Sequence, residues 1–129
     1  MWRHITQYLA RFAPNNDLLE LGAGYCDFSN AVPAGTRTAM DLDEALRDSA
    51  APGVRAEVGD CTDLSRFGAS TFDVVFASNL LEHLVRADGV RLLQEARRVL
   101  RPGGHLILMQ FRLRPHESRR SSRDFCRSP

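Results

Sequence analysis

The sequence of 129 residues contains no lysine, so all 17 of its basic residues are arginine, a bias that decides nothing about mechanism. Cysteine is also scarce: Cys26, Cys61 and Cys126 lie far apart and show no CxxC or histidine-paired spacing. We expect reduced packing groups there and no metal site. No apolar run approaches the roughly 18 residues of a membrane helix, and the N-terminus lacks a signal-peptide core. These absences predict a cytoplasmic protein with no membrane partner.

The composition is that of a single globular domain. A chain of 129 residues is long enough for one core and too short for two, and 43% hydrophobic with 26% charged residues is average for soluble proteins. The net charge of +1 hides an asymmetry, because residues 112–129 hold six arginines against two acids, a net charge of +4, and residues 1–111 therefore carry −3. We expect a folded domain over 1–111 and a basic Arg/Ser-rich tail over 112–129 that does not fold alone. The tail lacks interleaved aromatic residues, so no nucleic-acid partner is predicted.

Helical and strand patterns alternate along the chain and are separated by short Gly/Pro loops. This alternation predicts an α/β fold, a Rossmann-like doubly wound parallel sheet of about five strands with flanking helices. The best strand is the segment over 72–77, FDVVFA, whose β-branched and apolar residues are typical of a strand buried on both faces. The expected helices are 2–12, 27–32, 44–49 and 90–100, and the expected strands are 17–21, 36–42, 54–58, 72–77 and 105–111.

The residues that follow the strands are candidates for ligand binding. In an open α/β sheet, ligands bind outside the carboxyl ends of the strands. Gly22 and Gly24 follow the first strand and let the backbone approach a ligand closely. Asp41 ends the second strand, 19 positions after Gly22, close to the ~20 expected for a carboxylate that holds ribose hydroxyls. Asp60 ends the third strand, and the small polar stretch 77–79 ends the fourth.

Asp27 stands where a dinucleotide-binding motif has its third glycine. A carboxylate beside that helix end would repel a pyrophosphate, which dinucleotide sites hold at the helix N-terminus. A ligand with a ribose and a cationic or zwitterionic end would meet no such repulsion. The pattern therefore favours an adenosyl amino acid over NAD.

Five stretches, LELGAGYCD, AMDLD, VGDCTDL, FDVVFASNLLEHL and EARRVLRPGGHLILM, occur in order over residues 17–109. With them the chain resembles the class I S-adenosylmethionine-dependent methyltransferases of the small-molecule type. The resemblance implies an enzyme that uses S-adenosylmethionine as cofactor and methylates a small-molecule acceptor. It also implies the contacts of the cofactor. Its methionine part passes Gly22, Ala23 and Gly24 with Glu20 beneath, its ribose lies on Asp41, its adenine on Leu42, Asp60 and the Cys61 backbone, and its amino-acid end near Ala77 to Asn79.

His83 is the histidine that lies near a strand end on the ligand side, and a side chain with an unperturbed pKa near ~6.5 suits a catalytic base. A base is needed only if the acceptor arrives protonated. The alternative is that Glu82 and His83 merely shape the loop.

Structural alternatives also stand for the other candidates: a plain tight turn for the glycines, a helix cap for Asp41, and a turn around Thr62 for Asp60. We expect Arg97, Arg98 and Arg101 to form a solvated helix face.

The resemblance departs from the family after the fifth strand. Members usually add two antiparallel strands there, whereas the 18 residues after Phe111 have neither strand periodicity nor enough apolar side chains. Strand 105–111 would then be an uncovered apolar edge, which predicts a homodimer or domain swap through it, or an aggregation-prone monomer. Three functions stay open: an active methyltransferase whose pocket a partner completes, a cofactor-binding but catalytically silent regulatory or shortened protein, and a nucleotide-binding oxidoreductase, which Asp27 disfavours.

Overall fold

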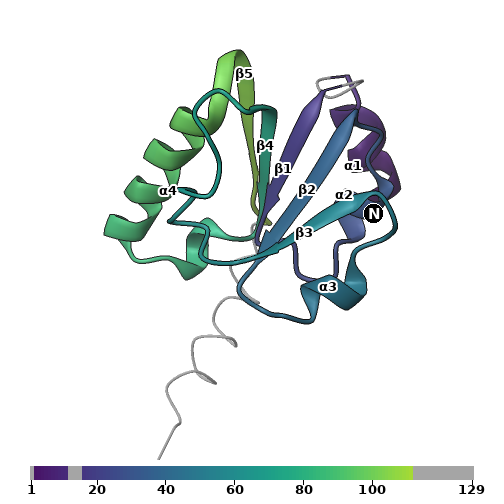
Figure 1. Cartoon of the computed structure of the whole chain (residues 1–129), viewed down its shortest axis with the longest axis horizontal. Helices are drawn as coiled ribbons and strands as arrows, with labels where there is room; N and C mark the ends of the chain where they lie inside the picture. The colour runs from purple at the N-terminus through teal and green to yellow at the C-terminus, as the bar shows by residue number, and fades with distance from the viewer. Residues whose placement is uncertain (1, 12–15, 112–129) are drawn as a thin grey trace, which may run out of the picture.

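A five-stranded parallel sheet forms the centre of the computed structural model, which describes residues 2–11 and 16–111 (Figure 1). The order of the strands is β3-β2-β1-β4-β5, and all four neighbouring pairs are parallel. The winding reverses between β1 and β4, which confirms the predicted doubly wound sheet. The strands are β1 (Asp17–Leu21), β2 (Thr36–Asp41), β3 (Val54–Val58), β4 (Phe72–Ser78) and β5 (Leu100–Met109).

Helices cover both faces of the sheet (Figure 1). On one face lie α1 (Trp2–Leu9), α2 (Asp27–Ala31) and α3 (Leu46–Ser49), and on the other lies α4 (Arg86–Val99). A single 3-10 turn, η1 (Leu81–His83), connects β4 to α4. Within the described ranges, none of these helices combines the length and the apolar character needed to cross a bilayer. The predicted tail over 112–129 and the predicted helix end at Phe12 lie outside the described residues.

β4 is central because its sequence is apolar on both sides. Val75 and Ala77 belong to the core cluster under α4, together with Leu92 of that helix. The alternate residues Val74 and Phe76 pack instead under α1 and α2. Successive side chains of a strand point to opposite faces, so the middle of a strand buried between two helical layers is apolar on both sides, and the polar residues of β4, Asp73 and Ser78, lie near its two ends. The prediction for this segment is confirmed.

Two elements begin earlier than the sequence pattern indicated. Helix α4 starts at Arg86 rather than at residue 90, and Asp88 in its first turn complements the positive end of the helix dipole. Strand β5 starts at Leu100 rather than at residue 105, because the chain passes an irregularity with Gly103 at φ +81° and then resumes pairing with β4. A Cβ on Gly104 would lie 2.8 Å from the Asp73 carbonyl oxygen, so the close approach there requires glycine. The Pro-Gly-Gly sequence therefore ends the helix and bends the strand without breaking it.

Candidate functional site

A cleft of about 360 Å³ opens at the carboxyl ends of the strands, at the lower end of the sheet in Figure 1. It brings together segments that are far apart in the sequence: the turn after β1, the ends of β2 and β3, the loop after β4 and the first turn of α4. Apolar side chains and carboxylates both contribute to its walls. The lining residues are Gly22, Asp41, Leu42, Gly59, Asp60, Cys61, Thr62, Leu80, His83, Leu84 and Asp88.

The turn after β1 has a left-handed backbone. Gly22 and Gly24 have φ values of 66° and 53°, a region that costs most other residues strain. The amide of Ala23 donates to the Met40 carbonyl oxygen at 3.0 Å, which holds the turn against the end of β2. A Cβ on Gly22 would lie 3.0 Å from a methyl carbon of Leu80. The side chain of Leu80 therefore packs directly over the glycine turn inside the cleft.

Asp41 ties the end of β2 to this turn. Its Oδ2 atom accepts a hydrogen bond from the Gly24 amide at 2.9 Å, and Oδ1 accepts one from the Asp43 amide at 3.0 Å. The alternative of a helix cap is wrong for Asp41, because α3 follows Ala45 and has no side-chain cap. An ionised carboxylate has about four acceptor sites, so both oxygens keep capacity for a ligand. The next residue, Leu42, is 73% exposed and offers an apolar surface to the cleft.

Asp60 shapes the loop after β3. Its Oδ1 atom accepts hydrogen bonds from the Thr62 amide at 2.8 Å and from the Thr62 hydroxyl at 2.9 Å, so the predicted turn around Thr62 is present. Between them, Cys61 lines the cleft and is half-buried. Burial raises the pKa of the Cys61 thiol to about 11, and the charge of Asp60 adds to the effect. This thiol is protonated at neutral pH and is a packing group rather than a nucleophile.

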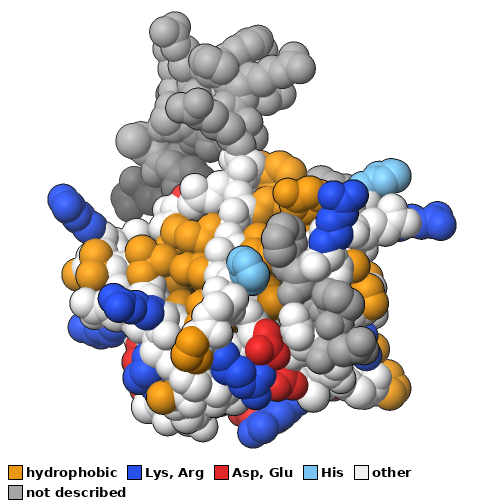
Figure 2. Space-filling view, turned by 90° about the horizontal axis from the view of Figure 1, so that it is seen from above, with side chains coloured by type: hydrophobic (Ala, Val, Ile, Leu, Met, Phe, Trp, Pro, Cys, Tyr) orange, Lys and Arg blue, Asp and Glu red, His pale blue; other side chains and the backbone are white. Residues whose placement is uncertain are grey.

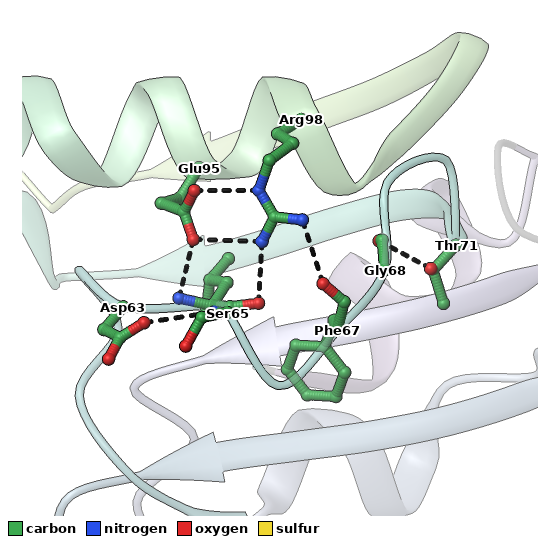
Figure 3. A network of polar contacts seen from close by, with 8 residues as sticks. Asp63, Ser65, Phe67, Gly68, Thr71, Glu95 and Arg98 are labelled. Carbon is green, nitrogen blue, oxygen red and sulfur yellow. Dashed lines mark hydrogen bonds and ion pairs between the residues drawn. The ribbon is translucent and has the colours of Figure 1, made fainter.

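An ion pair on α4 anchors the loop that carries Asp60 (Figure 3). Arg98 pairs with Glu95 at 2.9 Å and donates to the carbonyl oxygens of Leu64 at 2.8 Å and Phe67 at 2.9 Å. Glu95 in turn accepts from the Leu64 amide at 2.8 Å, and these contacts hold the pKa of its carboxyl below its usual range, with the Arg98 hydrogen bond as the main cause. The connection between β3 and β4 has no regular helix or strand in the structure, and this network fixes it against α4.

The prediction that Arg97, Arg98 and Arg101 form a solvated face is therefore wrong for two of them. Arg98 binds the loop, and Arg101 pairs with Asp17 at 2.7 Å and with Asp73 at 2.8 Å. The Asp73 carboxylate also accepts the Asp17 amide at 2.9 Å. These contacts join the starts of β1, β4 and β5 at the end of the sheet opposite the cleft.

Glu20 lies beneath the glycine turn and is 4% exposed. Its carboxylate accepts hydrogen bonds from the Ser29 amide at 3.1 Å and from the Ser29 hydroxyl, which joins β1 to α2. Burial raises the pKa of Glu20 to about 7 although both bonds from Ser29 oppose the shift, and the nearby charges of Asp27 and Asp41 raise it further. Glu20 therefore supports the turn from below, and it does not line the cleft.

The candidates at the end of β4 have other surroundings. The side chain of Ala77 lies in the core, and Asn79 has φ +50°. The Asn79 amide donates to the Met109 carbonyl oxygen at 2.8 Å, and its side-chain oxygen accepts from the Phe111 amide at 2.9 Å. Asn79 thus extends the pairing of β4 with the end of β5. Its side chain faces the neighbouring strand.

His83 is exposed on η1 and lines the cleft beside Leu84 and Asp88. Its amide donates to the Leu80 carbonyl oxygen at 3.1 Å, so the residue also takes part in the turn that follows β4. The position satisfies the first requirement of a base, which is access to a bound ligand.

The cleft unites six of the eleven predicted site residues: Gly22, Asp41, Leu42, Asp60, Cys61 and His83. Glu20, Ala23, Gly24, Ala77 and Asn79 surround or support it without lining it. Sequence reasoning missed Gly59, Thr62, Leu80, Leu84 and Asp88. Leu80 and Leu84 flank the predicted base, and a search for apolar residues in the loop after β4 would have found them. Among the residues that the structure describes, no group of three or more His, Cys, Asp or Glu side chains is placed to hold a metal ion.

Comparison with known proteins identifies a family for most of the chain. Residues 19–108 match the family described as Methyltransferase domain. The highly reducing polyketide synthase PKS2 of Leptosphaeria maculans is 29% identical over 87% of this chain and 5% of its own length. The ubiquinone/menaquinone biosynthesis C-methyltransferase UbiE of Cereibacter sphaeroides is 31% identical over 80% of this chain and 45% of its own.

Among solved structures, phosphoethanolamine N-methyltransferase 1 of Haemonchus contortus, in complex with phosphoethanolamine and S-adenosylhomocysteine, superimposes with a TM-score of 0.69 at 20% identity. The match covers 88% of this chain and 28% of that protein, and it shows a shared fold. The chain thus spans less than half the length of each of these three relatives.

Proposed function

Because this chain belongs to the family of S-adenosylmethionine-dependent methyltransferase domains, we propose that it binds S-adenosylmethionine in the cleft and transfers its methyl group to a small-molecule acceptor. One observation supports this most directly: Gly22, Asp41 and Asp60 lie at the carboxyl ends of three different strands and line one cleft. The cleft lies at the carboxyl ends of the strands, next to the point where the winding reverses. That is the place where open α/β sheets bind ligands.

The side chains of the cleft fit this cofactor. The Asp41 carboxylate suits the two ribose hydroxyls, and the exposed Leu42 suits one face of the adenine ring. Asp60 and the backbone at Cys61 suit the polar edge of that ring. Gly22 gives the methionine part a surface without a Cβ, and Glu20 holds this turn from below through Ser29.

The charge of the cleft favours a cation over a dinucleotide. Asp41, Asp60 and Asp88 all line it, and a sulfonium and an ammonium group complement such a wall. Asp27 begins α2 and is exposed beside the turn, where a pyrophosphate would have to lie. Both features oppose NAD and support the adenosyl amino acid.

The chemistry requires little of the protein beyond alignment. A sulfonium supplies an already activated methyl group, so its transfer is an in-line displacement. The apolar side chains of Leu42, Leu80 and Leu84 exclude water and restrict the geometry, which are the main contributions that this chain can make. His83 removes a proton where the acceptor arrives protonated.

A small-molecule acceptor is supported by the relatives' names, which include a C-methyltransferase of ubiquinone/menaquinone biosynthesis and a phosphoethanolamine N-methyltransferase. The chain spans less than half of the length of each of these proteins. Methyl transfer to a small molecule is therefore a proposal for this chain and is not carried over from the whole relatives. The reaction class that these relatives support is methyl transfer. The assay described below is needed to identify the acceptor atom.

Calorimetric titration with S-adenosylmethionine, S-adenosylhomocysteine and NAD tests the proposal. We expect the first two compounds to bind and NAD not to bind. A chain that binds NAD as well as S-adenosylmethionine, or that binds neither, would overturn the cofactor assignment. A second assay follows labelled methyl groups into a crude metabolite extract. Binding without any transfer would instead favour a catalytically silent cofactor-binding protein.

A further inference from the structure

The Asp88 carboxylate lines the cleft and has no hydrogen bond or ion pair with any residue that the structure describes. The two other acids of the cleft have structural contacts: Asp41 accepts two backbone amides, and Oδ1 of Asp60 accepts both donors of Thr62. Asp88 is half-buried in the first turn of α4, where its charge suits the helix dipole. The dipole leaves both of its oxygens available to a ligand.

The acids of the cleft differ from those at the opposite end of the sheet. Figure 2 looks at that end and shows acidic side chains beside arginines, in keeping with the pairing of Asp17 and Asp73 with Arg101. Among the described residues that line the cleft, three are aspartates and none is an arginine. A carboxylate without a neighbouring guanidinium keeps its lone pairs for the donors of a bound ligand.

Asp88 lies at the end of the cleft that is proposed to hold the adenine. The Cys61 thiol lies among the three carboxylates: burial is the main cause of its raised pKa, and the charges of Asp60, Asp41 and Asp88 raise it further. The backbone of Cys61 and the side chain of Asp60 are the proposed contacts of the adenine edge. Asp88 is therefore a neighbour of these contacts, although it belongs to a different element.

The edge of adenine needs more than one acceptor. Its 6-amino group has two hydrogens, one on the side of N1 and one on the side of N7. Because Oδ1 of Asp60 already accepts two hydrogen bonds from Thr62, Oδ2 is its main acceptor for a ligand. With N1 against the Cys61 backbone, this oxygen takes the hydrogen on the N1 side. The other hydrogen needs a second acceptor, since a desolvated donor without a partner costs binding free energy.

We propose that Asp88 accepts the second hydrogen of the adenine 6-amino group, so that carboxylates from the loop after β3 and from α4 together select a 6-aminopurine. This inference rests on the proposed function, because it requires an adenosyl cofactor in the cleft. Leu42 and Leu84 line the same cleft and offer apolar surface to the ring. A 6-oxopurine would turn an acceptor oxygen toward the two carboxylates and leave all of them without a donor.

Titration with S-adenosylhomocysteine and with its analogue that lacks the 6-amino group tests the inference. The ratio of the two dissociation constants measures the contribution of the amino group, and it cancels effects of a variant on folding or on the overall charge of the cleft. Asp88→Ala should reduce this ratio roughly tenfold, as expected for a lost hydrogen bond to a charged acceptor. The matched control is Glu82→Ala, because Glu82 is an exposed acid of η1 that does not line the cleft. Its ratio should equal that of the wild type.

The outcomes separate this inference from the proposed function. If the wild type does not bind S-adenosylhomocysteine, the proposed function fails and the inference fails with it. If it binds and Asp88→Ala leaves the ratio unchanged, or Glu82→Ala reduces it equally, only the inference is overturned.

Asp88→Asn is the second variant, for the case that Asp88→Ala does not fold. Its side-chain amide can donate to a 6-oxo group, so the preference for S-adenosylhomocysteine over S-inosylhomocysteine should fall roughly tenfold relative to the wild type. A preference that is not reduced overturns the inference.

Discussion

The Asp41 carboxylate accepts a hydrogen bond from the Gly24 amide at 2.9 Å, which joins the end of β2 to the turn that follows β1. The acid expected to hold the ribose is thus also the residue that fixes the turn expected to hold the methionine part. The two halves of the proposed cofactor site depend on one side chain. A change at Asp41 should therefore affect the whole site rather than one contact.

Asp41→Ala should weaken the binding of S-adenosylmethionine by about 1–3 kcal/mol, because charge-assisted hydrogen bonds to the ribose are lost and the turn is released. Calorimetric titration measures this change. Asp43→Ala is the matched control: Asp43 is also exposed and acidic, and its carboxylate accepts the Ala45 amide instead. An unchanged dissociation constant for Asp41→Ala, or an equal loss in the control, would place the ribose elsewhere.

Alanine at Gly22 and at Gly24 should have different costs. Both positions have positive φ, so each substitution should lower the free energy of unfolding by about 1–2 kcal/mol through backbone strain. At Gly22 the new Cβ also meets Leu80 at 3.0 Å, whereas at Gly24 no atom lies within 4 Å. We expect the larger loss for Gly22→Ala in chemical denaturation. A Leu80→Ala background should abolish the difference between the two substitutions, and a difference that persists there would contradict the steric account.

The residues at the carboxyl ends of the strands could be predicted, because the local sequence determines their positions. A buried apolar strand followed by Gly22, and a strand ending in Asp41, place these residues by rules of parallel sheets that need no knowledge of distant contacts. The same rule also predicted Asp60. The position of Ala77 near the end of β4 was also predicted. Its side chain does not reach the cleft, because β4 continues to Ser78 and Ala77 packs in the core under α4.

Long-range side-chain contacts were not predictable. Arg98 has the spacing of a solvated helix residue, and only the path of the loop over 64–67 brings two carbonyl oxygens within its reach. Similarly, Asn79 follows a strand like any ligand-binding residue, yet the end of β5 occupies its side-chain oxygen. Both depend on segments that are distant in the sequence, whose relative placement no local pattern contains.

His83→Ala should slow methyl transfer by about 100-fold if the imidazole is the base, because general-base catalysis contributes at least that much. The dissociation constant of S-adenosylmethionine should change little, so the loss should appear in kcat. The control is His4→Ala, since His4 lies in the groove between α1 and β5. A near wild-type rate would restore the role of His83 as a residue that shapes the loop.

Arg98→Leu should lower the free energy of unfolding by about 1 kcal/mol or more, because the carbonyl oxygens of Leu64 and Phe67 lose their donor. Since the same loop carries Asp60, affinity for S-adenosylmethionine should fall as well. Arg97→Leu, one position earlier on the helix and outside this network, is the control for lost charge and changed helix propensity. Denaturation and titration of both variants measure the effect. Equal stabilities would show that the loop holds its position without Arg98.

The raised pKa of Glu20 predicts that the free energy of unfolding falls as the pH rises. Its pKa is about 7 in the folded protein against an ordinary value of 4.5, so between these values the folded state binds the extra proton. Stability should therefore decline by about 3 kcal/mol from pH 4.5 to pH 7 through this group and then level off. Glu20→Gln, which keeps an oxygen acceptor for Ser29 and cannot ionise, should remove this part of the decline. Denaturant titrations of both proteins across that range measure it. Parallel pH profiles for the two proteins would show that the carboxylate beneath the turn is ionised in the folded state.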